Sequence, residues 1–328
     1  MTTRRSALQA LAATAALPLV LGAARPARAQ TIAQLTIVVG FPPGGATDGV
    51  ARLAAEGLRG KYADVVVVEN RAGGAGRLGA MHVKEGPADG SMLLFTPAFP
   101  LAIFPHIYPD LPYDAFADFI PVATTSKGNL ALSVGPAMPA EVKTLQDFVA
   151  WCKANPERAN FGAPTGGGQH FAGATLAREA GIPLQVVGYK GGAPATVDLL
   201  GGHIASSINP LSEVVQFARD GKLRILATTG DERSSFLPEV PTMKEFGYNV
   251  VFQDWSGFLA PAGTPPEVVA RANAAINDFV RSEKGAAGLK AFVTEADVHT
   301  PESFAALYKA TWERYRDVVR ETGFKAEA

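Results

Sequence analysis

The chain has 328 residues, of which 47% are hydrophobic and 19% are charged, and its formal net charge at pH 7 is −1. These proportions are typical of a globular protein and exclude a disordered or membrane-spanning chain, while the length allows about two domains. Cys152 is the single cysteine. It cannot form an internal disulfide, and its helical context predicts a buried thiol.

Residues 1–29 have the pattern of an export signal peptide. Arg4 and Arg5 precede the apolar stretch Ala7–Ala24, and Ala27-Arg28-Ala29 supplies a small–x–small cleavage pattern. A membrane anchor is the weaker alternative, because the apolar run is short and interrupted. The arginine pair points to the twin-arginine route, although ordinary signals also contain such pairs. The segment holds four arginines and no acid, so its removal changes the net charge from −1 to −5, which argues against nucleic acid as a partner.

The mature chain is expected to begin with a strand, a glycine turn and a helix. The run Leu35–Val39 is rich in β-branched residues and predicts a buried strand, and Gly49–Leu58 has helical spacing. Between them, Gly40–Asp48 contains two prolines that stiffen the turn and glycines that leave its amides bare. A helix N-terminus with bare amides can seat an anion. A plain strand-to-helix connection is the equally open alternative.

A second glycine-rich segment follows the next β-branched run, Asp64–Asn70. Gly74, Gly76 and Gly79 match the spacing of the dinucleotide-binding fingerprint. The next strand, Met92–Thr96, ends in Thr-Pro where a ribose-binding acid would be required. We therefore reject a dinucleotide site and expect a tight turn.

The middle of the chain alternates strands and helices, which predicts parallel strands with crossover helices. We expect separate strands at Phe119–Thr125 and Leu130–Val134, with the chain leaving the first lobe between them. The stretch Asn249–Ala262 is expected to return to it. The predicted lobes are residues 30–127 plus 252–328 and residues 128–251, with a cleft between them.

Other glycine loops at strand ends resemble the first one chemically. Thr165 can donate a hydroxyl, and the bare amides of Gly167 and Gly168 can donate to a carboxylate. Tyr189 precedes a similar loop, and Thr96 ends a strand where ligands of open α/β sheets bind. Several such loops in one exported chain favour an anion-binding cleft.

Some candidate residues have alternative roles. Asp48 would repel a carboxylate if it faced the cleft, so capping or orienting the first helical turn is the favoured role. His170 could donate to an anion or pack a helix, and Asn209 could form a turn or offer an amide to the cleft. Phe41 could be an apolar ligand wall or an ordinary core residue, and Lys190 is expected to point into solvent.

Sequence patterns for catalysis are absent. The five histidines are scattered, without an H-x-x-x-H pair or a cysteine cluster that would build a metal site. The sequence has neither a G-x-S-x-G nucleophile elbow nor a phosphate-binding G-x-x-x-x-G-K-[ST] loop. We therefore expect no catalytic residue, no metal and no cofactor, although a spatially assembled active site stays open.

The chain resembles the Bug-type periplasmic solute-binding receptors of tripartite tricarboxylate transporters over essentially all of its mature length. The resemblance rests on the following segments: Phe41–Gly45 with Asp48, Val68–Arg71 followed by Gly73–Gly79, Leu111–Asp114, Tyr189–Gly192 with Asp198–Gly202, Leu237–Thr242, and Leu259–Pro265. It implies a two-lobed, type II-like α/β fold in which each lobe is a mainly parallel sheet flanked by helices. It also implies that the cleft closes on a small carboxylate, held by loop amides and waters without an arginine clamp.

Together, the loops and the resemblance give one set of expected ligand-binding residues. They are Phe41, Gly44, Gly45, Ala46, Thr47, Asp48, Thr96, Thr165, Gly167, Gly168, Gln169, His170, Tyr189 and Asn209. Two departures from the family pattern affect the far end of the ligand. Pro164–Gly168 replaces a loop that commonly carries serine, and Ser207–Asn209 stands where many relatives have an aspartate. Losing that acid would favour a ligand without an amino group.

The expected function is a periplasmic receptor that captures a di- or tricarboxylate, or an aromatic acid, as a monomer. Its expected partners are the small carboxylate and the integral-membrane subunits of a tripartite tricarboxylate-type transporter. Two alternatives remain at this stage, a ligand-sensing subunit for a membrane signalling kinase and a periplasmic enzyme acting on carboxylates.

Overall fold

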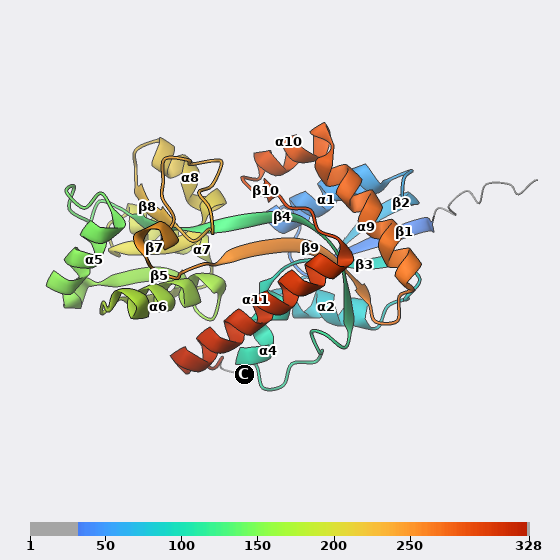
Figure 1. The fold of residues 1–328 in the computed structure, drawn as a ribbon, viewed down its shortest axis with the longest axis horizontal. Helices are drawn as coiled ribbons and strands as arrows, with labels where there is room; N and C mark the ends of the chain where they lie inside the picture. Colours follow the sequence, from blue (N-terminus) through green and yellow to red (C-terminus); the bar gives the residue numbers. More distant parts are fainter. Residues whose placement is uncertain (1–31, 327–328) are drawn as a thin grey trace, which may run out of the picture. The chain divides into compact units, whose positions relative to one another are not determined.

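The structure, a computed structural model, describes residues 32–326 and has an α/β architecture (Figure 1). The predicted export signal, residues 1–29, lies outside the described residues. The described strands form one mixed sheet with the order β2-β1-β3-β9-β4-β7-β5-β6, and β8 and β10 also pair with β4. Their bounds are β1 (Ile32–Val39), β2 (Ala63–Asn70), β3 (Met92–Pro97), β4 (Phe119–Val134), β5 (Asn160–Pro164), β6 (Gln185–Tyr189), β7 (Ser206–Pro210), β8 (Arg224–Thr228), β9 (Gln253–Pro261) and β10 (Glu295–Ala296).

Helices connect most of the strands. The α-helices are α1 (Ala46–Leu58), α2 (Arg77–Lys84), α3 (Phe99–Ala102), α4 (Phe104–Ile107), α5 (Leu145–Ala154), α6 (Gly168–Ala180), α7 (Gly192–Leu200), α8 (Leu211–Arg219), α9 (Pro266–Arg281), α10 (Glu283–Ala291) and α11 (Pro301–Thr322). The short 3-10 helices are η1 (Gly74–Gly76), η2 (Pro156–Arg158) and η3 (Lys244–Phe246). This alternation confirms the predicted α/β class.

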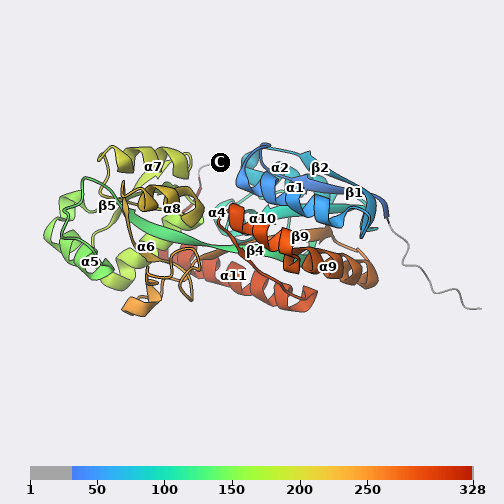
Figure 2. The same ribbon diagram turned by 90° about the horizontal axis from the view of Figure 1, so that it is seen from above.

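The sheet has two halves that β4 joins. In the β1 half, β1 is parallel to β2 and β3, and β9 is antiparallel to β3 and β4. In the β5 half, β5 is parallel to β6 and β7, and β4 is antiparallel to β7 and β8. Figure 1 shows β4 and β9 running between the halves, and Figure 2 shows α11 alongside β4, extending toward α6.

The two strands predicted at Phe119–Thr125 and Leu130–Val134 are one continuous strand, β4. The expected break at Gly128-Asn129 does not occur, because these residues keep pairing with Gln253 and Asp254 of β9. From Leu130 onward the partners of β4 also include β7 and β8. The described residues form one compact unit, and the predicted division into two lobes remains a prediction.

The core lies on both faces of the sheet. Helices α1 and α9 pack on one face of the β1 half through a cluster that includes Leu35, Ile37 and Phe279. On the other face Trp255 of β9 is buried against Phe304 of α11. Neighbouring residues of a strand point to opposite faces of the sheet. Because Trp255 is buried on one face, the residues on either side of it in β9 point to the other face.

The glycines that resemble a dinucleotide fingerprint serve close packing. A Cβ atom at Gly79 would lie 2.7 Å from the Cα atom of Gly40, so α2 approaches the end of β1 closely only with glycine at this position. Gly76 has a φ of 100°, which favours glycine at the start of α2. These contacts explain the glycine spacing without a nucleotide.

Candidate ligand-binding site

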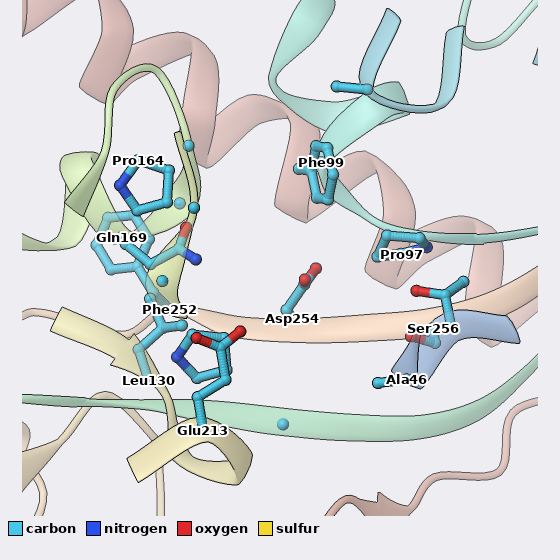
Figure 3. Close-up of a pocket in the computed structure, with 18 of the residues that line it drawn as sticks. Ala46, Pro97, Phe99, Leu130, Pro164, Gln169, Glu213, Phe252, Asp254 and Ser256 are labelled. Atoms are coloured by element: carbon cyan, nitrogen blue, oxygen red, sulfur yellow. The ribbon is translucent and has the colours of Figure 1, made fainter. Parts of the chain in front are cut away.

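The carboxyl ends of several strands meet at a cavity of about 800 Å³. The turns after β1, β5, β6 and β7 each lead directly into a helix, and first-turn residues of α1, α6, α7 and α8 line this cavity. Ligands of open α/β sheets bind at such strand ends. Figure 3 shows side chains from α1, α6, α8 and β9 around one space.

The N-terminus of α1 contributes Ala46 and Thr47 to the cavity wall. The preceding Gly44 has a φ of 87°, a left-handed conformation that favours glycine. Gly45 is the N-cap and has no side chain that could bond the first amides of the helix. Those amides therefore keep their capacity to donate to a ligand. Gly44 and Gly45 themselves are not among the described lining residues.

Asp48 stabilises this turn by hydrogen bonds on the side away from the cavity. Its Oδ2 atom accepts hydrogen bonds of 2.9 Å from the Gly44 amide and from Arg52 Nε, and its Oδ1 atom accepts one of 2.9 Å from Asn70 Nδ2. Burial raises the pKa of Asp48, but the bonds from Arg52, Gly44 and Asn70 outweigh it and lower the pKa below its usual value. Asp48 is not among the lining residues, so its position fits the orienting role.

The Asp48 network also positions Phe41. Asn70 Nδ2 donates a second bond of 3.0 Å to the Phe41 carbonyl. The Phe41 ring lines the cavity and packs edge-on against Phe99. The aromatic residues Phe104, Phe252, Tyr315 and Phe324 also line it. A large part of the wall is therefore apolar, as is common in small-molecule sites.

The second turn, between β5 and α6, places Thr165, Gly167, Gly168 and Gln169 in the cavity wall. Gly167 is the N-cap of α6 and, like Gly45, provides no side-chain cap.

His170 supports the α6 turn rather than lining the cavity. It is 9% exposed, and its Nδ1 accepts a hydrogen bond of 3.2 Å from the Gly166 amide. Its ring stacks on Phe171 and meets Phe324 edge-on. Burial lowers the pKa of His170, which keeps the ring neutral and able to accept at Nδ1. This position fits the packing role, the second of the two open alternatives for His170.

The turn before α7 brings Tyr189, Lys190 and Gly192 to the wall, and the start of α8 brings Pro210 and Leu211. The N-caps of both helices lack side-chain hydrogen bonds to their first turns. The Tyr189 hydroxyl donates a bond of 2.7 Å to Asp198 of α7.

Asn209 and Thr96 lie close to the cavity but are not among its described lining residues. Asn209 is fully buried, and its Nδ2 donates to Thr196 Oγ1 at 3.0 Å, which ties β7 to α7. Thr96 is also buried, and its hydroxyl donates to the Pro97 carbonyl at 3.0 Å. Pro97, not Thr96, reaches the wall. The ligand-binding role of all these residues stays a prediction.

Two acidic residues that the sequence reasoning missed also line the cavity, Glu213 of α8 and Asp254 of β9. In Figure 3 both carboxyl groups point into the space between the labelled side chains. Asp254 Oδ1 accepts a bond of 3.1 Å from the Ala98 amide. The available signal was the alternation in β9: Trp255 is buried in the core, so Asp254 and Ser256 must face the other way.

Asp254 makes stability depend on pH. Burial raises the pKa of its carboxyl to about 7, and the bond from the Ala98 amide only partly opposes this. The folded-state pKa thus exceeds the unfolded value of about 3.9, so the contribution of this group to stability falls as the pH rises from about 4 to about 7. We expect Asp254→Asn to gain stability relative to the parent protein over this window. Urea unfolding at about pH 4.5 and pH 7.5 measures the difference, and an equal difference at both values would contradict it.

Within residues 32–326, no helix is long and apolar enough to cross a membrane. The same residues contain no group of three or more histidine, cysteine, aspartate or glutamate side chains placed to hold a metal ion.

Comparisons with known proteins agree with this architecture. A family model described as "Tripartite tricarboxylate transporter family receptor" matches residues 50–324. Protein BugT of Bordetella pertussis is 34% identical over 309 residues, covering 93% of this chain and 94% of BugT. The family and fold are those of periplasmic solute-binding receptors.

Two solved structures of similar proteins contain ligands. Rpa4515 of R. palustris, solved with adipate, is 29% identical and has a TM-score of 0.77, with 89% of this chain and 98% of that chain covered. MatC of Rhodopseudomonas palustris, with bound malate, is 26% identical and has a TM-score of 0.71, with 87% and 98% covered.

Proposed function

Because the chain belongs to the tripartite tricarboxylate transporter receptor family, we propose that it is a receptor that captures a small organic carboxylate. It would pass this ligand to the integral-membrane subunits of a tripartite tricarboxylate-type transporter. We also propose that residues 1–29 direct export to the periplasm, with Arg4 and Arg5 pointing to the twin-arginine route, and that the receptor acts as a monomer.

One observation carries the proposal: four helix N-termini without side-chain caps line one cavity. Each N-terminus has unpaired amide donors and about half a positive charge. Preorganised amides and ordered waters in a partly desolvated cavity can hold a carboxylate without an arginine. The bound ligands of the similar proteins, adipate and malate, are both small carboxylates, which supports a carboxylate as the ligand of the present chain.

The proposed mechanism is closure of two lobes, residues 30–127 plus 252–328 and residues 128–251, about the strands β4 and β9. Ala46 and Thr47 lie in the first proposed lobe, and Gly168, Gln169 and Gly192 lie in the second. A ligand that contacts both sets stabilises the closed state by its differential affinity for that state. The same contacts would make capture dependent on both lobes.

Calorimetry tests the proposal with protein that has been unfolded, stripped of ligand and refolded. Adipate, malate, citrate and benzoate are the probes, and at least one is expected to bind. Mass spectrometry of the small molecules released from the purified protein identifies the natural ligand. No binding of any probe, together with no released organic acid, would overturn the proposal.

A further inference from the structure

The cavity contains two carboxyl groups without a cationic partner. Among residues 32–326, Glu213 forms no ion pair and accepts no hydrogen bond, and Asp254 has only the Ala98 amide as a donor. Both oxygens of Glu213 and the second oxygen of Asp254 are therefore available to the cavity that both residues line (Figure 3). Asp254 is partly buried, and such carboxylates are normally paired, so its free oxygen calls for a donor from outside the described chain. Glu213 is exposed and can offer its carboxylate to the same donor.

A third acceptor lies beside Glu213. Asn209 Oδ1 is fully buried and has no hydrogen-bond partner among the described residues. A Cβ atom built on Gly192 would lie 2.0 Å from Glu213 Oε2 and 2.9 Å from Asn209 Oδ1. Both oxygens thus flank the Cα atom of Gly192, which itself lines the cavity. A buried acceptor without a donor is costly, and this one lies next to the Glu213 oxygen that faces Gly192.

The charges around the cavity point the same way. Lys190 is the basic side chain among the described lining residues, against the two acids Glu213 and Asp254. Above the pKa of about 7 of Asp254, a ligand with two carboxylates would bring further negative charge next to this ionised acid, where like charges repel. A ligand with one carboxylate and one positive charge satisfies both the helix N-termini and the acids.

We propose that the ligand carries a protonated nitrogen in addition to its carboxylate, and that Glu213 and Asp254 receive this nitrogen while first-turn amides receive the carboxylate. The inference rests on the proposed function and narrows its ligand class to amino carboxylates. It also revises the expectation, drawn from Ser207–Asn209, of a ligand without an amino group, because Glu213 brings an acid to the cavity.

Three matched series of linear probes test which charge the site accepts at the end of the ligand opposite its carboxylate. Each series contains a monocarboxylate, a dicarboxylate and an amino carboxylate of equal length: hexanoate, adipate and 6-aminohexanoate, with the corresponding four- and five-carbon compounds. Calorimetry at about pH 8, above the pKa of about 7 for Asp254, is done with EDTA present. At the length that binds best, the amino carboxylate is expected to bind at least tenfold more tightly than the dicarboxylate.

Isosteric variants locate the effect. Glu213→Gln and Asp254→Asn are each expected to weaken binding of the amino carboxylate about tenfold, the usual scale for one ionic hydrogen bond. Binding of the dicarboxylate should become tighter or stay unchanged. Glu157→Gln on η2, which is exposed and outside the cavity, is the control for the lost charge and should change neither. The preference of the parent protein for the amino carboxylate over the dicarboxylate is measured without any variant. Poor folding of a variant therefore does not weaken the test.

Tighter binding of the dicarboxylate at every length would overturn this inference and leave the proposed function standing. Dicarboxylate binding that appears only when Ca²⁺ replaces EDTA would also overturn it, because a metal ion would then occupy the place assigned to the nitrogen. If no probe of either panel binds, the proposed function fails and the inference fails with it.

Discussion

Replacing Asp48 with alanine is expected to lower the free energy of unfolding by about 1–3 kcal/mol, the scale for removing one partner of a hydrogen bond and leaving the other unsatisfied. The Asp48 side chain is 3% exposed and joins the Gly44 amide, Arg52 and Asn70 in one network. Alanine would leave these donors without their acceptor. Urea unfolding followed by circular dichroism measures the loss.

The pH dependence of this loss identifies its origin. Since the folded-state pKa of Asp48 is lowered, its ionised form stabilises the protein above the unfolded pKa of about 3.9, and this stabilisation is lost as the pH falls through the folded value. The difference between parent and variant should therefore shrink on acidification below about pH 4. Glu56→Gln removes an exposed acid of the same helix, paired with Lys284, and should change stability little. A loss for Asp48→Ala that is as small as that of this control would contradict the assigned role.

The sequence predicts the parts of the site that depend on local backbone chemistry. Bare amides after Gly44-Gly45 and after Gly167 follow from glycine next to a helix start, and the structure places Ala46, Thr47, Gly168 and Gln169 in one cavity wall. The preference for Asp48 as an orienting residue follows from the same local logic, because an acid in the first helical turn finds unpaired amides close by.

The acids at the far end depend on information that the sequence does not display. Asp254 reaches the cavity because β9 pairs with both β3 and β4, which puts this residue opposite Gly128 and next to the Ala98 amide. Glu213 reaches it because α8 begins directly after β7, beside Gly192 of α7. Strand order and register between distant segments decide both positions. For the same reason the continuous strand β4 was predicted as two, since its pairing with β9 is not local.

The other large effect is expected for Ala46→Pro, which removes one amide donor from the cavity and keeps the helix. Ala46 is the first residue of α1, and the preceding Gly45 is extended, with φ −79° and ψ 170°. Proline is favoured at this first helical position, and an extended residue before it avoids a clash. The change should therefore leave thermal stability nearly unaltered.

Binding should respond strongly, because a hydrogen bond from an amide to a carboxylate contributes about 1.5–3 kcal/mol. The Kd of the tightest-binding probe is therefore expected to rise by about tenfold to a hundredfold in Ala46→Pro. Ala46→Ser keeps the amide hydrogen and adds a side chain of similar size, so it should bind within about threefold of the parent protein. Calorimetry on both variants measures the effect. Equal affinities for the parent and Ala46→Pro would show that the first amide of α1 does not hold the carboxylate, and equal losses in both variants would attribute the effect to crowding at the cavity wall instead.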